Sequence, residues 1–547
     1  MKHWHLPALA ICCAAFSLVM VWDMVVPFDG LAYKDGDPHD SGQMTWNLWH
    51  VADSVLHARN PFETTRAYYP VGVNLAKHTL VSGFVPLTLL VRLFSGNGPL
   101  WPIYAFNIAV WLSYTMLLLF SYLTLRALGF GMAVSIVPAI GFAFSDFYYF
   151  HATHLNLLAG FFMPLCALLL IRLCRAPSRW RAIALAAAVA YSAYFTQLFI
   201  SIVLALAIFG LVALVSRGMR LALLRLLQAL GWRTLLASLL VFAGIIAPLC
   251  YEYVRCKTLL PPREDFYRLS ANLAGYFVPA RHTTWLYGDL LRPLQDRITT
   301  GWWGFEIFLG YPFLVCLVAG LFRPRRYHVG LYVVALTFLV LSLGPYLKVL
   351  NHDVHIRLPY GWLMQFPPFN QERCPSRLST VAMFACLPIA AAGLKRILGW
   401  VRRHLCRTAS LAVWGVFLAW TVLETYSPAT VTHGHFQIPT AALAQLGPGP
   451  VTYLPLAEKP CAQSVLQTLH GHRSTNGCLA RHTPAELIWA NDLDRSFRED
   501  LWHYIALLNQ ARVQNILVVS DVEAEKLRVL QATGFNVIRC LTKETRP

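Results

Sequence analysis

The chain has 547 residues, of which 57% are hydrophobic and 13% are charged, and its formal net charge is +18. This balance excludes an ordinary soluble protein, in which about 25% of the residues are charged. The positive charge does not indicate nucleic acid, because the basic residues fall in short clusters between long apolar segments, at 172–181, 217–233, 323–326 and 395–407. Such clusters are typical of the cytoplasmic loops of a multi-pass membrane protein.

The first apolar segment runs from about Leu6 to Pro27. It has no small-residue cleavage site, so we expect a retained first span with a cytoplasmic N-terminus. With the basic clusters also placed in the cytoplasm, the apolar segments predict eleven transmembrane helices. The stretch 182–216 is expected to form a helical hairpin that breaks near Thr196 and Gln197. The spans lie near 7–27, 101–125, 130–146, 155–171, 182–196, 197–215, 234–252, 306–322, 329–347, 377–394 and 408–425.

The apolar stretch from Leu80 to Phe94 stays outside that count, because it is short and carries Pro86 and Arg92. If it crossed the membrane, the basic cluster at 172–181 would face outward, against the positive-inside rule. We therefore expect a juxtamembrane or re-entrant helix here.

The first extracytoplasmic loop, at about 28–100, holds the densest set of polar residues. Asp37 and Asp40 precede an expected helix that contains Trp46 and Trp49. A carboxylate just outside a bilayer can act as general base on a hydroxyl, provided that its pKa is tuned and that it reaches the acceptor. A solvated turn that caps the helix is the plain alternative.

Further polar residues lie at the outer ends of later spans. His154 lies at the outer end of the third span, just after it, and Glu306 begins the eighth. Ionisable groups at membrane depth are usually functional, although a lone histidine at an interface is more often a helix-end group. Arg373 and Arg377 lie four residues apart at the mouth of the tenth span, where a helix would place them on one face. Their guanidinium groups suit a phosphate, and anchoring in lipid headgroups is the alternative.

The tail changes character at about Pro448. Three short apolar runs predict buried strands, and a helix with a capping box at Ser520 and Glu523 is expected between the last two. Cys461 and Cys478 can pair in an oxidising compartment, although sequence alone does not decide it. No CxxC or HExxH spacing indicates a metal site. The strands are expected at Val451–Leu456, Asn515–Val519 and Phe535–Cys540.

The expected fold class is therefore a polytopic α-helical membrane protein with about 11 transmembrane helices and a small C-terminal α/β domain. The domain boundaries follow from the loops and spans. They are the first span at 1–27, the first extracytoplasmic loop at 28–100, the helical bundle at 101–425 and the extracytoplasmic α/β domain at 426–547.

The first loop resembles that of bacterial membrane proteins of the GT-C glycosyltransferase superfamily. The resemblance lies in an acidic residue before a Trp-rich helix, a run of the form "NPF...YYP.G.NL..HT" and a juxtamembrane helix. It implies a GT-C-like fold, a polyprenyl-phosphate sugar donor and a catalytic first-loop carboxylate. In the pattern, this carboxylate lies six residues before the Trp, with a Gln between them. Asp40 fits with Gln43 and Trp46, although His39 replaces a Gly, and Asp37 is the competing match.

The resemblance also implies roles for residues at matching positions. Lys77 and His78 precede the juxtamembrane helix, where related enzymes hold the donor phosphate with a basic residue. Arg373-Cys-Pro-Ser-Arg377 is similar to an Arg-x-Pro-x-Arg element of the same proteins and implies two more phosphate ligands. Cationic donors near a leaving phosphate lower the barrier to its departure. Roles in binding the sugar or the acceptor fall to Trp46, Trp49, Glu306 and His154.

These roles have structural alternatives. Lys77 is also suited to snorkelling at the membrane interface, and Trp46 and Trp49 to packing on a core. In the tail, the run from Gln467 to His472 resembles a motif of the same proteins, and we expect its domain to bind the acceptor or to serve as a packing module.

The predicted function is the transfer of one sugar from a polyprenyl-phosphate donor to a lipid, glycan or protein acceptor. It is expected on the outer face of a bacterial inner membrane, with the C-terminal domain in the periplasm. No cofactor is certain, and a divalent metal held in part by Glu306 stays open. The alternatives are a transporter or lipid flippase, and a non-catalytic assembly protein. The sequence speaks against a transporter, because its polar residues concentrate in the extracytoplasmic loops and no internal repeat is visible.

Overall fold

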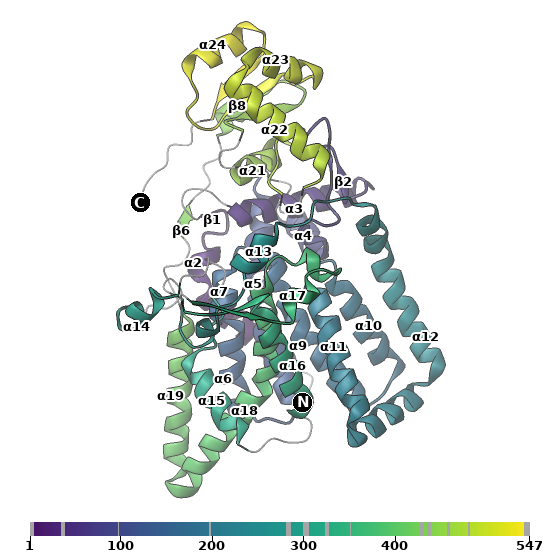
Figure 1. The fold of residues 1–547 in the computed structure, drawn as a ribbon, viewed down its shortest axis with the longest axis vertical. Coiled ribbons are helices and arrows are strands. Elements are labelled where there is room, and N and C mark those ends of the chain that lie inside the picture. Colours follow the sequence, from purple (N-terminus) through teal and green to yellow (C-terminus); the bar gives the residue numbers. More distant parts are fainter. Residues whose placement is uncertain are drawn as a thin grey trace. The chain divides into compact units, whose positions relative to one another are not determined.

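The computed structural model describes residues 5–540 except for 34–38, 97, 196–197, 281–285, 299–305, 323–327, 351, 427–431, 435–438, 457–459 and 480–481. The chain forms two compact units, drawn in Figure 1. Unit 1 contains residues 1–22, 111–247 and 260–430, and unit 2 contains residues 23–110, 248–259 and 431–547.

Unit 1 is almost entirely helical, as its apolar composition predicts. A hairpin of strands β4 (Tyr346–Val349) and β5 (His352–Arg357) and short 3-10 turns join its helices. The helices are α1 (His5–Met20), α6 (Met132–Ala143), α7 (Asp146–Phe150), α8 (Leu155–Leu158), α9 (Phe162–Arg175), α10 (Arg179–Ser192), α11 (Leu198–Val215), α13 (Arg263–Arg268), α14 (Gly288–Gln295), α15 (Tyr311–Leu321), α16 (His328–Ser342), α17 (Tyr360–Leu363), α18 (Ser379–His404) and α19 (Arg407–Thr425), with α5 (Trp101–Ala127) and α12 (Arg217–Arg255) continuing into unit 2.

The predicted membrane spans all contain a helix. Within the described part of the chain, seven helical segments are long and apolar enough to cross a membrane, and α1, α15 and α16 are shorter apolar helices. The chain is thus a multi-pass helical membrane protein, while the number of eleven spans stays a prediction. The stretch Leu80–Phe94 forms a 3-10 turn, Ser82–Phe84, and the ten-residue helix α4, Val85–Phe94.

Helix α12 bends at Gly231, where φ is 67° and ψ is 160° (Figure 1). Glycine adopts a positive φ without steric cost, so this residue allows the chain to turn between two helices. The first piece carries Arg217, Arg220 and Arg225 of the 217–233 cluster, and the second begins with Trp232 and Arg233 and contains the predicted span 234–252. The predicted break at Thr196 and Gln197 lies outside the described residues, between the end of α10 at Ser192 and the start of α11 at Leu198.

Small residues set the close contact between α15 and α18 in unit 1. A Cβ on Gly393 would lie 1.7 Å from the carbonyl oxygen of Cys316, and one on Gly320 would lie 2.2 Å from that of Ile389. Arg396 also donates from Nη1 to the carbonyl oxygen of Gly320, at 2.9 Å, near the end of α15. Backbones approach this closely in membrane bundles only where side chains are absent or small.

Unit 2 combines the first loop with the tail. Its helix α3 (His39–Leu56) packs against α21 (Pro460–His470). A parallel sheet contains, in spatial order, the strands β7 (Val451–Leu454), β8 (Asn515–Val518) and β9 (Asn536–Arg539). The other elements are α2 (Trp22–Val25), α4, α20 (Thr440–Leu443), α22 (Pro484–Glu499), α23 (Leu501–Gln510), α24 (Ala524–Ala532), and the antiparallel pairs β1 (Leu31–Tyr33) with β6 (Thr432–Gly434) and β2 (Glu63–Thr64) with β3 (Val73–Asn74).

The three predicted tail strands are present, as β7 (Val451–Leu454), β8 (Asn515–Val518) and β9 (Asn536–Arg539). Helices cover both faces of β8, which explains its unbroken apolar run. Ile516 and Val518 pack in the core that includes residues of α23 and α24, whereas Leu517 packs with Leu466 of α21. Figure 1 shows α23 and α24 near β8 at the yellow end of the chain.

The predicted capping box at Ser520 and Glu523 was wrong. Helix α24 begins only at Ala524, and its N-cap residue Glu523 makes no side-chain capping bond. A complete capping box lies instead at Thr483 and Glu486, at the start of α22. The start of α24 is set by where Leu527 and Leu530 pack, because both are buried in the core next to the sheet.

Candidate functional site

Asp40 lies in the first turn of α3 and is partly buried. The positive end of the helix dipole favours a carboxylate at this position. One turn further along, Gln43 Nε2 donates to the carbonyl oxygen of Cys478 at 3.0 Å. A disulfide, which the sequence left open, links Cys478 to Cys461 on α21, so the start of α3 is bound to a cross-linked segment. Asp37 lies outside the described residues.

The two tryptophans of α3 are core residues of unit 2. Trp46 is 2% exposed and Trp49 is 7% exposed. The Trp46 indole donates from Nε1 to Gln467 Oε1 at 2.8 Å and stacks on His50 with the ring centroids 4.9 Å apart. Trp49 faces the guanidinium of Arg66, whose carbon lies 4.6 Å from the ring centroid. These contacts match the packing alternative, and sugar binding by either ring stays a prediction.

Two buried histidines of unit 2, His50 and His470, have lowered pKa values. Burial, with a smaller effect from the charge of Arg66, lowers the pKa of His50 to about 4. Burial, with a smaller effect from His472, lowers the pKa of His470 to about 3. His470 Nε2 lies 2.7 Å from the hydroxyl of Tyr453. Neither imidazole titrates near neutral pH, so neither is suited to general acid–base work there.

The tail motif and the residues that follow it bind the first loop by hydrogen bonds. Gln467 Nε2 donates to the carbonyl oxygens of Arg66, at 2.6 Å, and His472, at 2.8 Å. The amide of Tyr69 donates to the carbonyl oxygen of Ser474 at 2.8 Å. The hydroxyl of Tyr68 donates to the carbonyl oxygen of Gly477 at 2.8 Å. The described contacts of the motif are thus those of a packing element.

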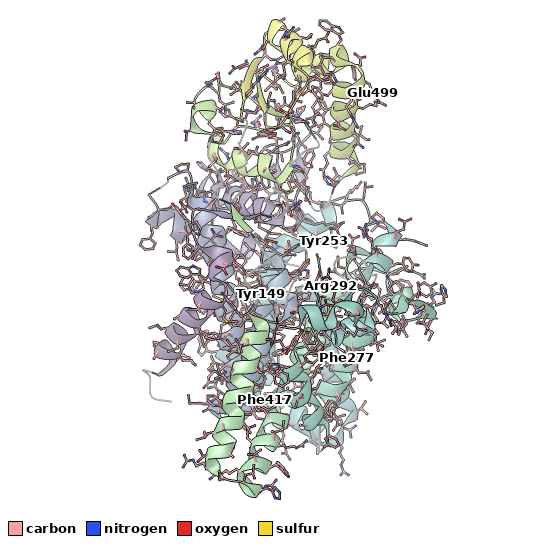
Figure 2. The ribbon with its side chains drawn as sticks, turned by 90° about the vertical axis from the view of Figure 1, so that its left-hand side faces the viewer. Tyr149, Tyr253, Phe277, Arg292, Phe417 and Glu499 are labelled. Carbon is pink, nitrogen blue, oxygen red and sulfur yellow. A yellow bond between two sulfur atoms is a disulfide. The ribbon has the colours of Figure 1, made fainter. Side chains whose placement is uncertain are left out.

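The segment with Lys77 and His78 is bound to the helix that carries Asp40. His78 is buried, with Nε2 lying 3.1 Å from Asn47 Oδ1, and Asn47 Nδ2 donates to the carbonyl oxygen of Thr79 at 2.8 Å. The Lys77 ammonium lies 4.8 Å from the ring centroid of Tyr253, a residue labelled in Figure 2. Helix α3 therefore carries the candidate base Asp40 and binds His78, one of the two candidate phosphate ligands of unit 2.

The two arginines of the last loop belong to unit 1, and each faces a carboxylate. Arg373 Nη1 lies 3.7 Å from Asp265 Oδ2, and Arg377 Nη1 lies 3.7 Å from Glu372 Oε1. The two arginines do not share a helix face, as Pro375 between them allows. The 3-10 turn begins at Pro375, because proline favours the first position of a helix, and this leaves Arg373 ahead of the turn.

Glu306 and His154 are buried in unit 1, at 0% and 7% exposure. His154 lies beside His151, with ring centroids 5.2 Å apart. Asp146, at the start of α7, is also buried and accepts the amide of Ala280 at 3.3 Å. Among the described residues, no group of three or more His, Cys, Asp and Glu side chains is placed to hold a metal ion.

Two carboxylates that anchor neighbouring segments were not among the sequence-based candidates. Glu424 on α19 accepts the hydroxyl of Tyr287 at 2.8 Å and the amide of Tyr311 at 3.0 Å, just after the Glu306–Gly310 segment. Glu252 at the end of α12 accepts two asparagine amides of the first loop. Both residues are buried. The sequence offered one signal for them, an acidic residue near the end of a predicted span.

The fold is similar to that of two solved structures of an archaeal oligosaccharyltransferase. The chain matches the archaeal oligosaccharyltransferase AglB from Archaeoglobus fulgidus in complex with an inhibitory peptide and a dolichol-phosphate, with a TM-score of 0.52, 9% identity, and coverage of 94% of this chain and 69% of that one. It matches the apo form of the Archaeoglobus fulgidus oligosaccharyltransferase with a TM-score of 0.53, 12% identity, and coverage of 98% and 72%. No family model and no curated protein sequence matches the chain. The chain therefore shares its fold with these two structures.

Proposed function

We propose that the protein is a membrane glycosyltransferase that moves a sugar from a polyprenyl-phosphate donor to a lipid, glycan or protein acceptor on the extracytoplasmic face of a bacterial inner membrane. The observation that carries this proposal is the oligosaccharyltransferase fold, which extends over at least 94% of the chain. One matched structure contains a dolichol-phosphate and an inhibitory peptide. Its ligands favour a lipid-linked donor and, among the acceptor classes, a peptide.

In the proposed reaction, a nucleophilic atom of the acceptor attacks the anomeric carbon of the donor sugar. The bond between that carbon and the phosphate oxygen breaks, and the polyprenyl phosphate leaves with the bonding electrons. Asp40, or Asp37 in its place, takes the proton of the acceptor. The position of Asp40 at the start of α3 supports its role, because the helix dipole favours its charged form, which is the form a base requires.

The leaving phosphate needs cationic groups, and the proposal assigns Lys77, Arg373 and Arg377 to it. His78 lies next to Lys77 and is bound to Asn47 of α3. In this proposal it helps to hold the segment as well as to face the phosphate. Glu306 and His154 are left to the acceptor or the sugar, and a divalent metal remains open. The disulfide between Cys461 and Cys478 supports an oxidising compartment for the tail.

Mass spectrometry of envelope lipids and surface glycans tests this function. The producing cells are compared as wild type, as a deletion strain, and as strains that carry Asp40→Asn or Asp37→Asn at normal protein levels. We expect the deletion and one of the two Asp→Asn strains to lose the same single sugar. A deletion that alters glycans while both Asp→Asn strains stay normal favours a transporter or an assembly protein instead.

A further inference from the structure

Glu252 lies in the last turn of α12 and is buried, with 7% of the residue exposed. Two effects disfavour a charge at this position. The C-terminal end of a helix carries the negative end of the helix dipole, and burial removes water from the carboxylate. A carboxylate is therefore retained here only if other groups bind it.

The groups that bind Glu252 come from two separate points of the first loop. Asn60 Nδ2 donates to Glu252 Oε1 at 2.9 Å, and Asn74 Nδ2 donates to Glu252 Oε2 at 3.4 Å. Arg255, one turn further along the chain, places Nη1 3.6 Å from Oε1. The two asparagines belong to the "NPF" and "NL" parts of the first-loop motif. One carboxylate thus cross-links both parts of the motif to α12.

The contacts of Asn74 lead directly to Lys77. The side-chain oxygen of Asn74 accepts the backbone amide of Ala76 at 3.0 Å. The backbone carbonyl oxygen of Asn74 accepts a hydrogen bond from the thiol of Cys256 at 3.5 Å. The ammonium of Lys77 then lies over the ring of Tyr253, the residue that follows Glu252. The end of α12 therefore holds the backbone before Lys77 and also supplies the surface on which its side chain rests.

We propose that Glu252 is a positioning residue that presents the Lys77 ammonium to the phosphate of the lipid-linked donor. This inference rests on the proposed function. A lysine side chain has several rotatable bonds, and fixing it costs conformational entropy. When the segment 74–77 is fixed through Asn74 and the ammonium rests on an aromatic face, much of that ordering precedes donor binding. An ammonium on a ring still directs N–H bonds away from the ring, toward an anion.

The test measures the affinity of the full-length protein in lipid nanodiscs for a polyprenyl phosphate without sugar. Lys77→Ala is expected to weaken binding about tenfold, as loss of one charge-assisted hydrogen bond does. Glu252→Ala and Asn74→Ala are each expected to weaken it by a similar factor. The conservative Glu252→Gln keeps one side-chain oxygen that can accept the amide of Asn74 and is expected to restore most of the affinity. Thermal unfolding of each variant identifies those that retain the fold.

Glu63→Gln is the matched control. Glu63 also pairs with Arg255, at 3.3 Å, but its side chain is 48% exposed. We expect its loss to change the affinity by less than about twofold, since exposed ion pairs contribute little.

The double variant Lys77→Ala, Glu252→Ala distinguishes positioning from a general structural effect. If Glu252 acts through Lys77, the double variant binds no more weakly than Lys77→Ala alone. If the double variant loses affinity by the product of the two single losses, the inference is overturned. Normal binding by both Glu252→Ala and Asn74→Ala also overturns it. In either case the phosphate role of Lys77 stands. Normal binding by Lys77→Ala instead contradicts that phosphate role, and with it the reason for the positioning.

Discussion

Removing the side chain of Gln467 should strongly destabilise unit 2. The residue is 1% exposed, and its side-chain amide makes hydrogen bonds to the indole of Trp46 and to the carbonyl oxygens of Arg66 and His472. In Gln467→Ala, the Arg66 carbonyl keeps the amide of Ser474, 2.7 Å away, as a partner. The indole N–H of Trp46 and the carbonyl oxygen of His472 lose their hydrogen bonds to Gln467.

The buried indole N–H that loses its partner costs about 1–3 kcal/mol, and each of the two lost hydrogen bonds to the carbonyl oxygens of Arg66 and His472 costs about 1 kcal/mol. We therefore expect Gln467→Ala to lower the free energy of unfolding by about 3–5 kcal/mol. Gln445→Ala is the control, because Gln445 is exposed and makes one bond to the carbonyl oxygen of Ala441. Its effect should stay within about 0.5 kcal/mol.

The assay is proteolysis of the detergent-solubilised protein after short exposure to increasing urea. Trp46→Phe removes the indole N–H, so adding Gln467→Ala to Trp46→Phe should cost about 1–3 kcal/mol less than adding it to the wild type. If Gln467→Ala behaves like Gln445→Ala, or if its effect simply adds to that of Trp46→Phe, the hydrogen bond between the first loop and the tail does not stabilise the unit as described.

Two further predictions concern close packing and pH. Gly393→Ala should lower the melting temperature, because the new Cβ would meet the carbonyl oxygen of Cys316 at 1.7 Å. Gly399→Ala, whose new Cβ would have nothing within 4 Å, should leave the melting temperature unchanged or raise it. Equal melting temperatures for the two variants would contradict the close contact. His50 and His470 have folded-state pKa values lowered to about 4 and about 3, so their contribution to stability is present above about pH 6.5, the unfolded value, and is lost as the pH falls from there toward 4 and 3. Urea midpoints should thus drop through this window less steeply in His470→Gln than in the wild type, and an unchanged slope would show that His470 is not buried in its neutral form.

The helical membrane fold and the tail strands follow from the sequence because their signals are local. A span needs only a long apolar run, and β8 shows its burial on both faces by an unbroken apolar stretch, Ile516–Val518. Helix starts were less predictable. Thr483 and Ser520 are both followed three residues later by Glu, yet only Thr483 forms the capping box, where Pro484 also favours the first helical position.

The environment of the candidate site could not be read from the sequence because its partners are distant along the chain. Trp46 is covered by Gln467, 421 residues later, so an aromatic helix that looked suited to sugar is packed inside unit 2. Asn60 and Asn74 meet Glu252, 192 and 178 residues away. Residue type and spacing identified the Asn-bearing motif, but only the folded chain shows the carboxylate that both asparagines bind.

The proposed glycosyl transfer is tested most directly with the purified full-length protein in lipid nanodiscs. Polyprenyl phosphates carrying a radiolabelled hexose, pentose or aminosugar are supplied with a peptide, a glycan or a lipid acceptor, and the label on each acceptor is followed. We predict label transfer with release of free polyprenyl phosphate for one donor and acceptor pair, abolished by Asp40→Asn or by Asp37→Asn. Transfer that persists in both variants would contradict the role of a first-loop carboxylate. Absence of transfer for every pair, together with movement of the intact labelled lipid across the bilayer of proteoliposomes, would make the protein a flippase.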